Sequence, residues 1–202
     1  MSEVKPVHPS LNFAQYASQQ IPEVKFLVSD GAKLALQDMT FDGVVSGLAL
    51  NFMPAPTNAL TDMWRITKPG GTVAAYVWDY AGKMEFLRYF WDAACELDDR
   101  AIQLHEGNRF PICQQDALHQ LWQNAGLNNI HVEAIDIPTR FDTFDAYWQP
   151  FTLGNFPAPN YVTSLTEVNR EKLKSHLQAS IPTEEDGSIN LIARVWAISG
   201  TR

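Results

Sequence analysis

Apolar residues follow two periods along this chain, and the two periods alternate. Val24–Val28 has a strand-like pattern, and Val44–Leu50 is a nearly continuous apolar run, typical of a strand that is buried on both faces. Leu60, Met63 and Trp64 fall three and four positions apart, which predicts a helix with one apolar face. Strands that alternate with helices favour an α/β fold with a mainly parallel sheet.

The same two patterns predict the remaining elements. We expect helices at 11–20 and 114–125, one or two helices within 161–179, and strands at 72–78, 130–137 and 189–198. Thr57 is placed to cap the helix that contains Leu60, and Lys68-Pro69-Gly70-Gly71 to end it in a turn. The order of the last two strands, 130–137 and 189–198, favours an antiparallel arrangement at the end of the sheet.

We interpret the 202 residues as a single domain with a buried core. Residues 1–80 supply core strands and helices, and 114–137 with 189–198 complete that core. Residues 82–110 and 143–179 form a helical, aromatic-rich cap or insertions. Two apolar stripes run along the helix expected after Gly82, which indicates an element packed between others or against a pocket.

Charge and composition narrow the classes of partner. A net charge of −8 argues against nucleic acid as a partner, because phosphate binding needs a basic surface.

We expect a cytoplasmic protein without a signal peptide or membrane span. Cys95 and Cys113 are then reduced and buried. The five histidines show no metal-ligand spacing, no nucleophile motif occurs, and no catalytic residue can be named.

Short motifs follow one another between Val24 and Asp79. Asp30 follows a strand, Phe41-Asp42 leads into the next, and Arg65-Ile66-Thr67-Lys68-Pro69-Gly70-Gly71 leads into a third. In this order and spacing the chain resembles class I S-adenosylmethionine-dependent methyltransferases of the ubiquinone/menaquinone-biosynthesis type, which act on small molecules. The resemblance covers Val7 to Asp79 by motif and extends more loosely to the C-terminus.

The resemblance assigns residues to the cofactor, S-adenosylmethionine. Asp30 with its neighbours matches the adenine contact, since a carboxylate at the end of a strand can accept from the exocyclic amine. His8 stands where the family has a ribose-binding aspartate, and an imidazole makes only one such hydrogen bond. For Asp30 the alternative is a turn residue, and for His8 it is an ordinary exposed histidine. For Gly47, Leu48 and Asn51 the alternative is plain sheet core. The full cofactor set is Asp30, Gly31, Ala32, Gly47, Leu48, Asn51 and His8.

The resemblance also exposes an absence. The family's first strand and glycine-rich loop belong before Val4, yet no glycine precedes Gly31. That loop lets the backbone approach the cofactor closely. We therefore expect a methyltransferase-like, Rossmann-related sheet that lacks its first strand, with a gap of roughly 10 Å and two unpaired edges. A strand-exchanged homodimer is one way to fill the gap.

Aromatic residues gather after the strand that ends at Asp79. By position they match the lining of an apolar acceptor pocket, and plain core packing is the alternative for each. The candidate pocket residues are Trp78, Tyr80, Phe90, Trp91, Phe110, Tyr147 and Trp148.

Three functions remain open at this stage. The first is a methyltransferase on a small acceptor, active alone or with its missing part supplied by another chain. The second is an inactive remnant that binds a small apolar ligand in the aromatic pocket. The third is a homo-oligomeric interaction module, formed where the unpaired strand edges associate.

Overall fold

The computed structural model describes residues 4–31 and 33–202, and its contacts divide the chain into two compact units. Unit 1 comprises the described residues up to Tyr76 together with His119–Val132 and Ile198–Arg202, and unit 2 comprises Val77–Leu118 and Glu133–Ala197. Several elements have residues in both units, so the single-domain interpretation stays a prediction. None of the helices in the described ranges is long and apolar enough to cross a membrane.

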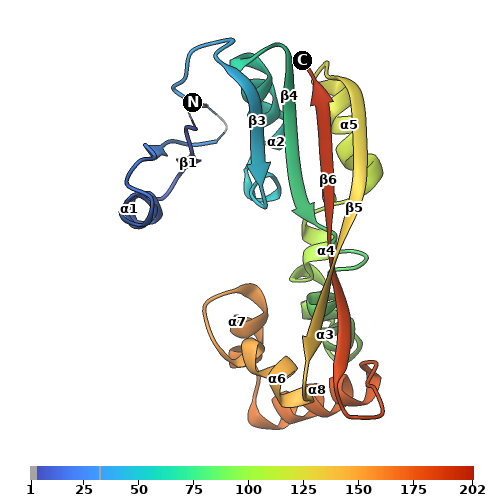
Figure 1. The fold of residues 1–202 in the computed structure, drawn as a ribbon. Helices are drawn as coiled ribbons and strands as arrows, with labels where there is room; N and C mark the ends of the chain where they lie inside the picture. The colour runs from blue at the N-terminus through green and yellow to red at the C-terminus, as the bar shows by residue number, and fades with distance from the viewer. Residues whose placement is uncertain (1–3, 32) are drawn as a thin grey trace. The chain divides into compact units, whose positions relative to one another are not determined.

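Unit 1 begins with a small β–α–β motif. Strand β1 (Val7–His8) and strand β2 (Leu27–Val28) pair in parallel, and helix α1 (Leu11–Gln20) connects them. The bounds of α1 are those predicted, and the Ser10 hydroxyl caps it by accepting from the Phe13 amide at 3.5 Å. The strand predicted at 24–28 is shorter than expected (Figure 1).

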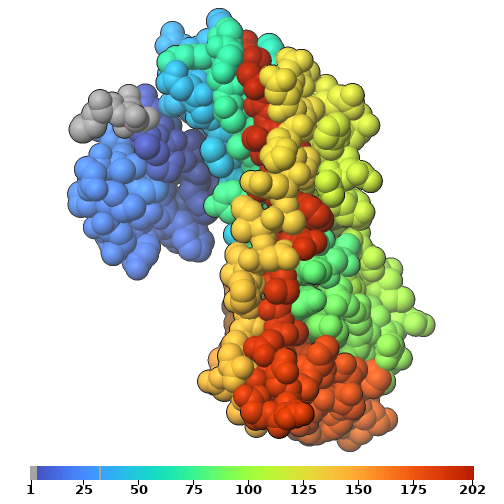
Figure 2. Space-filling view, turned by 45° about the vertical axis from the view of Figure 1, so that its right-hand side comes forward, coloured from blue at the N-terminus to red at the C-terminus, as the bar shows by residue number. Residues whose placement is uncertain are grey.

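Four longer strands form the main sheet. They are β3 (Phe41–Gly47), β4 (Thr67–Trp78), β5 (Asn128–Phe141) and β6 (Ile189–Thr201), in the order β3-β4-β6-β5. Strands β3 and β4 are parallel. Along β6 the numbering runs against β4, since Gly70 donates to Arg202 and Asp79 donates to Arg194 through backbone amides. The predicted antiparallel finish is confirmed, and Figure 2 shows β6 lying between β4 and β5.

The described strands of unit 1 do not form one continuous sheet. The interruption lies where the sequence predicts that the first strand is absent. Within the described ranges β1 and β2 pair only with each other, and β3 pairs only with β4. Val45 of β3 is 65 % exposed, whereas Val73 and Ala75 on β4 are buried. The expectation that this run is buried on both faces is therefore wrong for one face. No described segment covers that face, so an apolar side chain remains in contact with solvent.

Helix α2 (Pro56–Ile66) follows a short 3₁₀ turn, η1 (Leu50–Phe52), and contacts β3. Its cap is Ala55 and not Thr57, because Pro56 already occupies the first turn, where it loses no hydrogen bond. The glycine pair predicted as a turn instead lies in the first part of β4. Gly70 has a φ of +78°, and a Cβ on Gly71 would lie 2.8 Å from the carbonyl oxygen of Asp42. Both positions therefore require glycine.

Unit 2 is mostly helical and contains the larger aromatic core. Its core includes fully buried Phe90, Trp91, Tyr147 and Phe151. The predicted helix at 114–125 is confirmed as α5, and the region 161–179 contains two helices. The elements are α3 (Glu85–Leu97), η2 (Asp99–Gln103), α4 (Glu106–Arg109), α5 (Gln115–Asn124, which continues into unit 1), α6 (Phe144–Trp148), η3 (Gln149–Thr152), α7 (Pro157–Ser164) and α8 (Glu167–Ser180).

Candidate functional site

The ends of β2 and β3 approach each other in unit 1. Asp30 and Gly31 follow β2, and Met53 lies just beyond β3. A Cβ on Gly31 would lie 2.6 Å from the Cε atom of Met53, so the turn after β2 packs directly against the segment after β3. The structure thus places Gly31, from the first group of residues assigned to the cofactor, against Met53, which lies two positions beyond Asn51 of the second group. Ala32, also assigned to it, lies outside the described residues.

The backbone bends sharply at the end of β3. Leu48 has a φ of +51°, in the left-handed region, and its amide donates to the carbonyl of Tyr76 at 2.9 Å. A Cβ on Gly47 would lie 2.4 Å from the Tyr76 hydroxyl, so the tyrosine side chain packs directly over this position. Strained residues of this kind persist where the surrounding structure enforces them, and they cluster at binding sites.

Two buried polar groups at this strand end have no hydrogen-bond partner within residues 4–31 and 33–202. Asn51 is 8 % exposed, and its Nδ2 atom is one of these two groups. Ser46 is equally buried, and its Oγ atom is also unpaired among the described residues. A buried donor without a partner costs about 1–3 kcal/mol, so such groups call for an explanation. A polar ligand at the end of β3 would supply one.

His8 lies at the end of β1 and has a defined hydrogen-bonding role. Its Nδ1 atom accepts from the Ser10 amide at 3.0 Å, and its ring lies 5.1 Å from that of Phe13. Since Nδ1 accepts, the neutral ring carries its proton on Nε2. His8 can therefore donate one hydrogen bond to a ligand but cannot act as the bidentate acceptor that an aspartate would provide.

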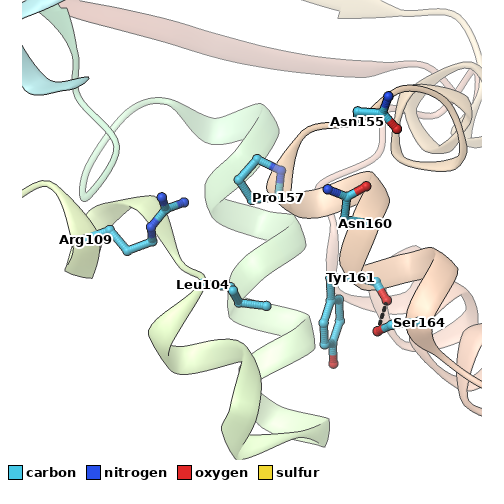
Figure 3. Close-up of a pocket in the computed structure, with 7 residues that line it drawn as sticks. All are labelled: Leu104, Arg109, Asn155, Pro157, Asn160, Tyr161 and Ser164. Carbon is cyan, nitrogen blue, oxygen red and sulfur yellow. Dashed lines mark hydrogen bonds between the residues drawn. The ribbon is translucent and has the colours of Figure 1, made fainter. Parts of the chain in front are cut away.

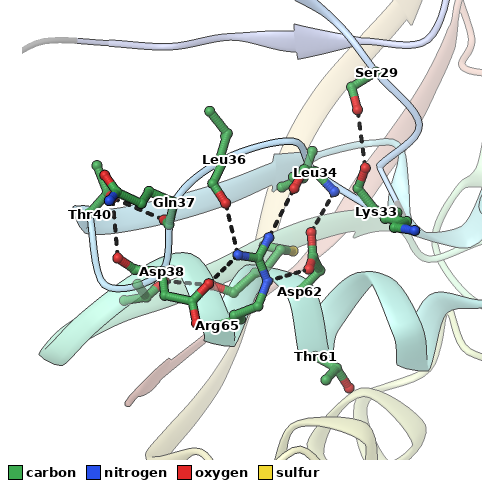
Figure 4. Close-up of polar contacts among 12 residues, drawn as sticks. Ser29, Lys33, Leu34, Leu36, Gln37, Asp38, Thr40, Thr61, Asp62 and Arg65 are labelled. Atoms are coloured by element: carbon green, nitrogen blue, oxygen red, sulfur yellow. Dashed lines mark hydrogen bonds and ion pairs between the residues drawn. The ribbon is translucent and has the colours of Figure 1, made fainter.

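Arg65 braces the segment that connects the end of β2 to the start of β3 (Figure 4). Its guanidinium donates to the carbonyls of Leu34 and Leu36 at 2.9 and 2.8 Å and to Asp62 at 2.7 Å, and it also pairs with Asp38. Asp62 in turn accepts from the Leu34 amide. Burial raises the pKa of Asp62, but the hydrogen bonds from Arg65 and Leu34 outweigh it and lower that pKa. Arg65 belongs to a motif that the sequence shows, but its bracing role could not be predicted from that motif.

Most of the expected pocket aromatics are packed core residues. Phe90, Trp91 and Tyr147 have no exposed surface, and Trp148 and Tyr80 are each 6 % exposed. This is the packing alternative that the sequence left open for each of them. Their role as a pocket lining stays a prediction, and it would require them to move.

Trp78 and Phe110 are the two half-buried members of the same set. The ring of Phe110 lies 5.6 Å from that of Tyr80, so it too belongs to an aromatic contact. Neither residue lines the two hollows found in unit 2.

The larger hollow in unit 2 has a volume of about 540 Å³ and a mixed lining (Figure 3). Its polar side chains are Arg109, Asn155, Asn160 and Ser164, and Leu104, Pro157 and Tyr161 supply the apolar part. A second hollow of about 340 Å³ also includes Tyr161. The phenol of Tyr161 donates to Asp98 at 3.2 Å.

Glu106 is a buried carboxyl group that the sequence analysis did not identify. It is 7 % exposed, and its Oε2 atom has no hydrogen-bond partner among the described residues. Burial raises the pKa of Glu106 above its ordinary value of 4.5. The folded protein therefore binds this proton more tightly than the unfolded chain does.

Replacing Glu106 with glutamine should stabilise the protein at neutral pH and have little effect at pH 4. With a raised folded pKa, the contribution of Glu106 is complete below the unfolded pKa and is lost as the pH rises through the folded pKa. Glutamine has no charge to bury, so we expect a gain of about 1–3 kcal/mol at pH 8. Urea unfolding at both pH values measures it. Glu171→Gln, at an exposed position, is the control, and equal effects of the two variants would contradict the argument.

Other reaction chemistries have no support in the described chain. Residues 4–31 and 33–202 contain no group of three His, Cys, Asp or Glu side chains that could hold a metal ion. Cys95 and Cys113 are both free thiols. Burial raises the pKa of Cys113 to about 12 and also raises that of Cys95, so neither is a ready nucleophile.

The N-terminal part of the chain is similar in sequence to known proteins. Residues 2–75 match a family described as a methyltransferase domain. Demethylmenaquinone methyltransferase of Renibacterium salmoninarum is 34 % identical over 62 residues, which is 31 % of this chain and 26 % of the relative. The enzyme of the same name from Streptomyces griseus is 34 % identical over 70 residues, or 35 % and 30 % of the two chains. The chain therefore spans less than a third of these curated relatives.

Solved structures match almost the whole chain. The YcgJ protein of Bacillus subtilis has a TM-score of 0.62 at 13 % identity, covering 99 % of this chain and 82 % of its own. A phosphoethanolamine N-methyltransferase of Haemonchus contortus, solved with S-adenosylhomocysteine, has a TM-score of 0.57 at 13 % identity and is covered over 43 % of its length. At this identity the likeness shows the fold. Residues 2–75 are therefore similar in sequence to a methyltransferase domain, and the chain as a whole has the α/β fold of these solved structures.

Proposed function

We propose that this chain binds the adenosine part of S-adenosylmethionine at the ends of β2 and β3 and takes part in methyl transfer to a small molecule. The observation that carries the proposal is the unpartnered Nδ2 atom of buried Asn51. It lies in the same short segment as the strained backbone of Leu48, and Gly31 packs against that segment through Met53. A ligand at this edge would satisfy the amide, and open α/β sheets bind ligands at such an edge.

The residues at this edge suit the polar groups of adenosine. The carboxylate of Asp30 can accept a hydrogen bond from the exocyclic amine, and the amide of Asn51 can donate to a ring or ribose oxygen or nitrogen. His8 can donate one hydrogen bond from Nε2 to a ribose hydroxyl. The cofactor, when bound, supplies a methyl group on a sulfonium centre, and the chain contributes mainly position and alignment.

The fit does not extend to the methionine end of the cofactor. That end needs closely approaching backbone amides, and no glycine precedes Gly31 in this sequence. The proposal therefore separates two steps. Adenosine binding rests on residues of this chain, whereas methyl transfer needs a further segment around the methionine end. The acceptor class, a small molecule, is inferred from relatives named as demethylmenaquinone methyltransferases.

Replacing Asn51 with leucine should leave the protein folded and weaken its binding of S-adenosylhomocysteine at least tenfold. The leucine removes the buried unpaired amide, so folding should lose nothing, while the ligand loses a donor. Isothermal titration measures the affinity. For the unaltered protein we expect micromolar binding, which corresponds to about −8 kcal/mol.

Asn58→Leu is the matched control, since Asn58 is an exposed asparagine on α2. It should bind as the unaltered protein does. No heat from the folded, unaltered protein would overturn the proposal and favour the second function, an inactive remnant. Equal binding by the Asn51 and Asn58 variants would show that the ligand lies elsewhere.

The open edge of β3 supports a second candidate, association of two copies of the chain. Within the described residues β3 pairs on one side only, and the apolar Val45 on it is 65 % exposed. Unpaired strand edges invite pairing with another chain, and exchange between identical subunits is a low-cost route to a dimer. Light scattering should give a dimer, and Val45→Lys should give a monomer. A monomer in both cases would exclude this candidate.

A further inference from the structure

We propose that the larger hollow of unit 2 is a binding site for a small organic anion, a molecule with a carboxylate or phosphate group and a flat apolar body. Every residue of this site belongs to unit 2, so the proposal does not depend on the cofactor site at the ends of β2 and β3. Two observations carry it: Arg109 forms no ion pair among the described residues, and the side chains around it have a suitable chemistry.

Arg109 differs from the other arginines of unit 2. Those five each form an ion pair with a carboxylate, and Arg109 forms none among the described residues. Its guanidinium instead lies 5.1 Å from the ring centre of its neighbour Phe110. The paired arginines are Arg88, Arg100, Arg140, Arg170 and Arg194. A guanidinium without a carboxylate partner retains its donors for a ligand, and its planar fork matches a carboxylate or a phosphate.

The lining opposite Arg109 adds donors and no negative charge. Asn155 and Asn160 provide amide groups, and the Ser164 hydroxyl already donates to the Tyr161 carbonyl at 2.7 Å. In Figure 3, Arg109 and Leu104 lie on one side of the hollow, and Asn155, Asn160 and Ser164 lie on the other. No aspartate or glutamate lines this hollow, although the chain as a whole carries 23 acidic residues. The carboxyl group of buried Glu106 interacts electrostatically with Arg109 but does not line the hollow. Arg109 is therefore the one charged residue of the lining, and the lining favours an anion.

The apolar part of the lining defines the rest of the ligand. Leu104 and Pro157 provide aliphatic surface, and Tyr161 provides the face or edge of an aromatic ring. Tyr161 is 6 % exposed and is held by its hydrogen bond to Asp98, so its position is fixed. A volume of about 540 Å³ lies in the range of small-molecule sites. An aromatic or alicyclic acid is the simplest molecule that satisfies both parts of the lining.

Three probes of similar shape test this proposal with the full chain: benzoate, phenyl phosphate and the neutral benzamide. Titration followed by two-dimensional amide NMR should show shifts that centre on α4 and α7. We expect benzoate or phenyl phosphate to bind at least tenfold more tightly than benzamide. A preference for one of the two anions identifies the group as carboxylate or phosphate. Equal affinity for all three probes, or shifts confined to other parts of the chain, would overturn the proposal.

Arg109→Gln separates the anion site from general apolar binding. This variant should lower the affinity for the preferred anion at least tenfold and leave benzamide binding unchanged. Arg100→Gln is the control, because Arg100 lines only the second hollow and is paired with Asp98 at 2.8 Å. It should leave both affinities as they are. Loss of anion binding in both variants would point to net charge alone and would contradict a built site.

Discussion

Replacing Phe90 with alanine will lower the free energy of unfolding by about 4 kcal/mol. Phe90 has no exposed surface, and its ring stacks on that of Phe151 at 4.3 Å with an interplanar angle of 11°. It also meets the ring of Trp91 edge-on at 4.9 Å. Removing a buried aromatic ring typically costs about 3–5 kcal/mol, because the cavity left behind collapses only in part. Urea unfolding followed by tryptophan fluorescence measures the change, since Trp91 and Trp148 belong to the same core.

The result decides between the two roles that the sequence left open for this aromatic set. Side chains that line a ligand pocket already face empty space, so truncating one costs less than truncating a packed residue. Phe156→Ala is the matched control, because Phe156 is 72 % exposed in the same unit, and it should cost under about 0.5 kcal/mol. A cost below about 1 kcal/mol for Phe90→Ala would favour the pocket role.

The sequence could not decide this because core and pocket residues share the same composition. Phe90 and Trp91 lie on the two apolar stripes that predicted a helix packed between other elements, and both are buried in the structure. A periodic pattern shows which faces of a helix avoid water. It does not show whether the space opposite is filled by Phe151 and Tyr147 or left for a ligand.

Strand order could be predicted better than burial. The sequence analysis expects a sheet without its first strand and with two unpaired edges, and among the described residues β1 and β2 form one sheet while β3 lies at the edge of another. The apolar run of β3 also predicts burial on both faces, yet Val45 is 65 % exposed. An apolar run indicates that a strand is stable in surroundings that exclude water. Those surroundings include whatever covers the strand, and no described segment covers this face of β3.

The residues near the ends of β2 and β3 illustrate the same limit. The role of Asp30 as an adenine contact rests on the motif in the sequence and stays a prediction. Arg65 could be quoted from its motif, but its role could not be predicted. Two of its partners are the backbone carbonyls of Leu34 and Leu36, 31 and 29 positions away, and a carbonyl is present at every residue. Only the folded chain shows which carbonyls face a guanidinium.

Replacing Arg65 with alanine should therefore destabilise unit 1 by about 2–4 kcal/mol. The variant loses charge-assisted hydrogen bonds to two carbonyls, each worth about 1.5–3 kcal/mol before compensation by water. It also leaves the carboxylate of Asp62, whose side chain is 13 % exposed, without its cation. Without that guanidinium the pKa of Asp62 should rise, because burial then acts with less opposition. Urea unfolding measures the stability, and hydrogen exchange of the Leu34 amide reports the local loss of order.

Arg170→Ala is the control, because the Arg170 side chain is 34 % exposed against 30 % for Arg65 but has a single ion-pair partner, Glu167. An exposed i,i+3 pair of this kind contributes under about 0.5 kcal/mol. The chain that Arg65 braces runs from the turn at Gly31 to β3, so Arg65→Ala should also weaken binding of S-adenosylhomocysteine, whereas Arg170→Ala should not. If the two variants lose equal stability, the hydrogen bonds to Leu34 and Leu36 do not brace this segment, and the edge that presents Asp30 and Asn51 must be held by other contacts.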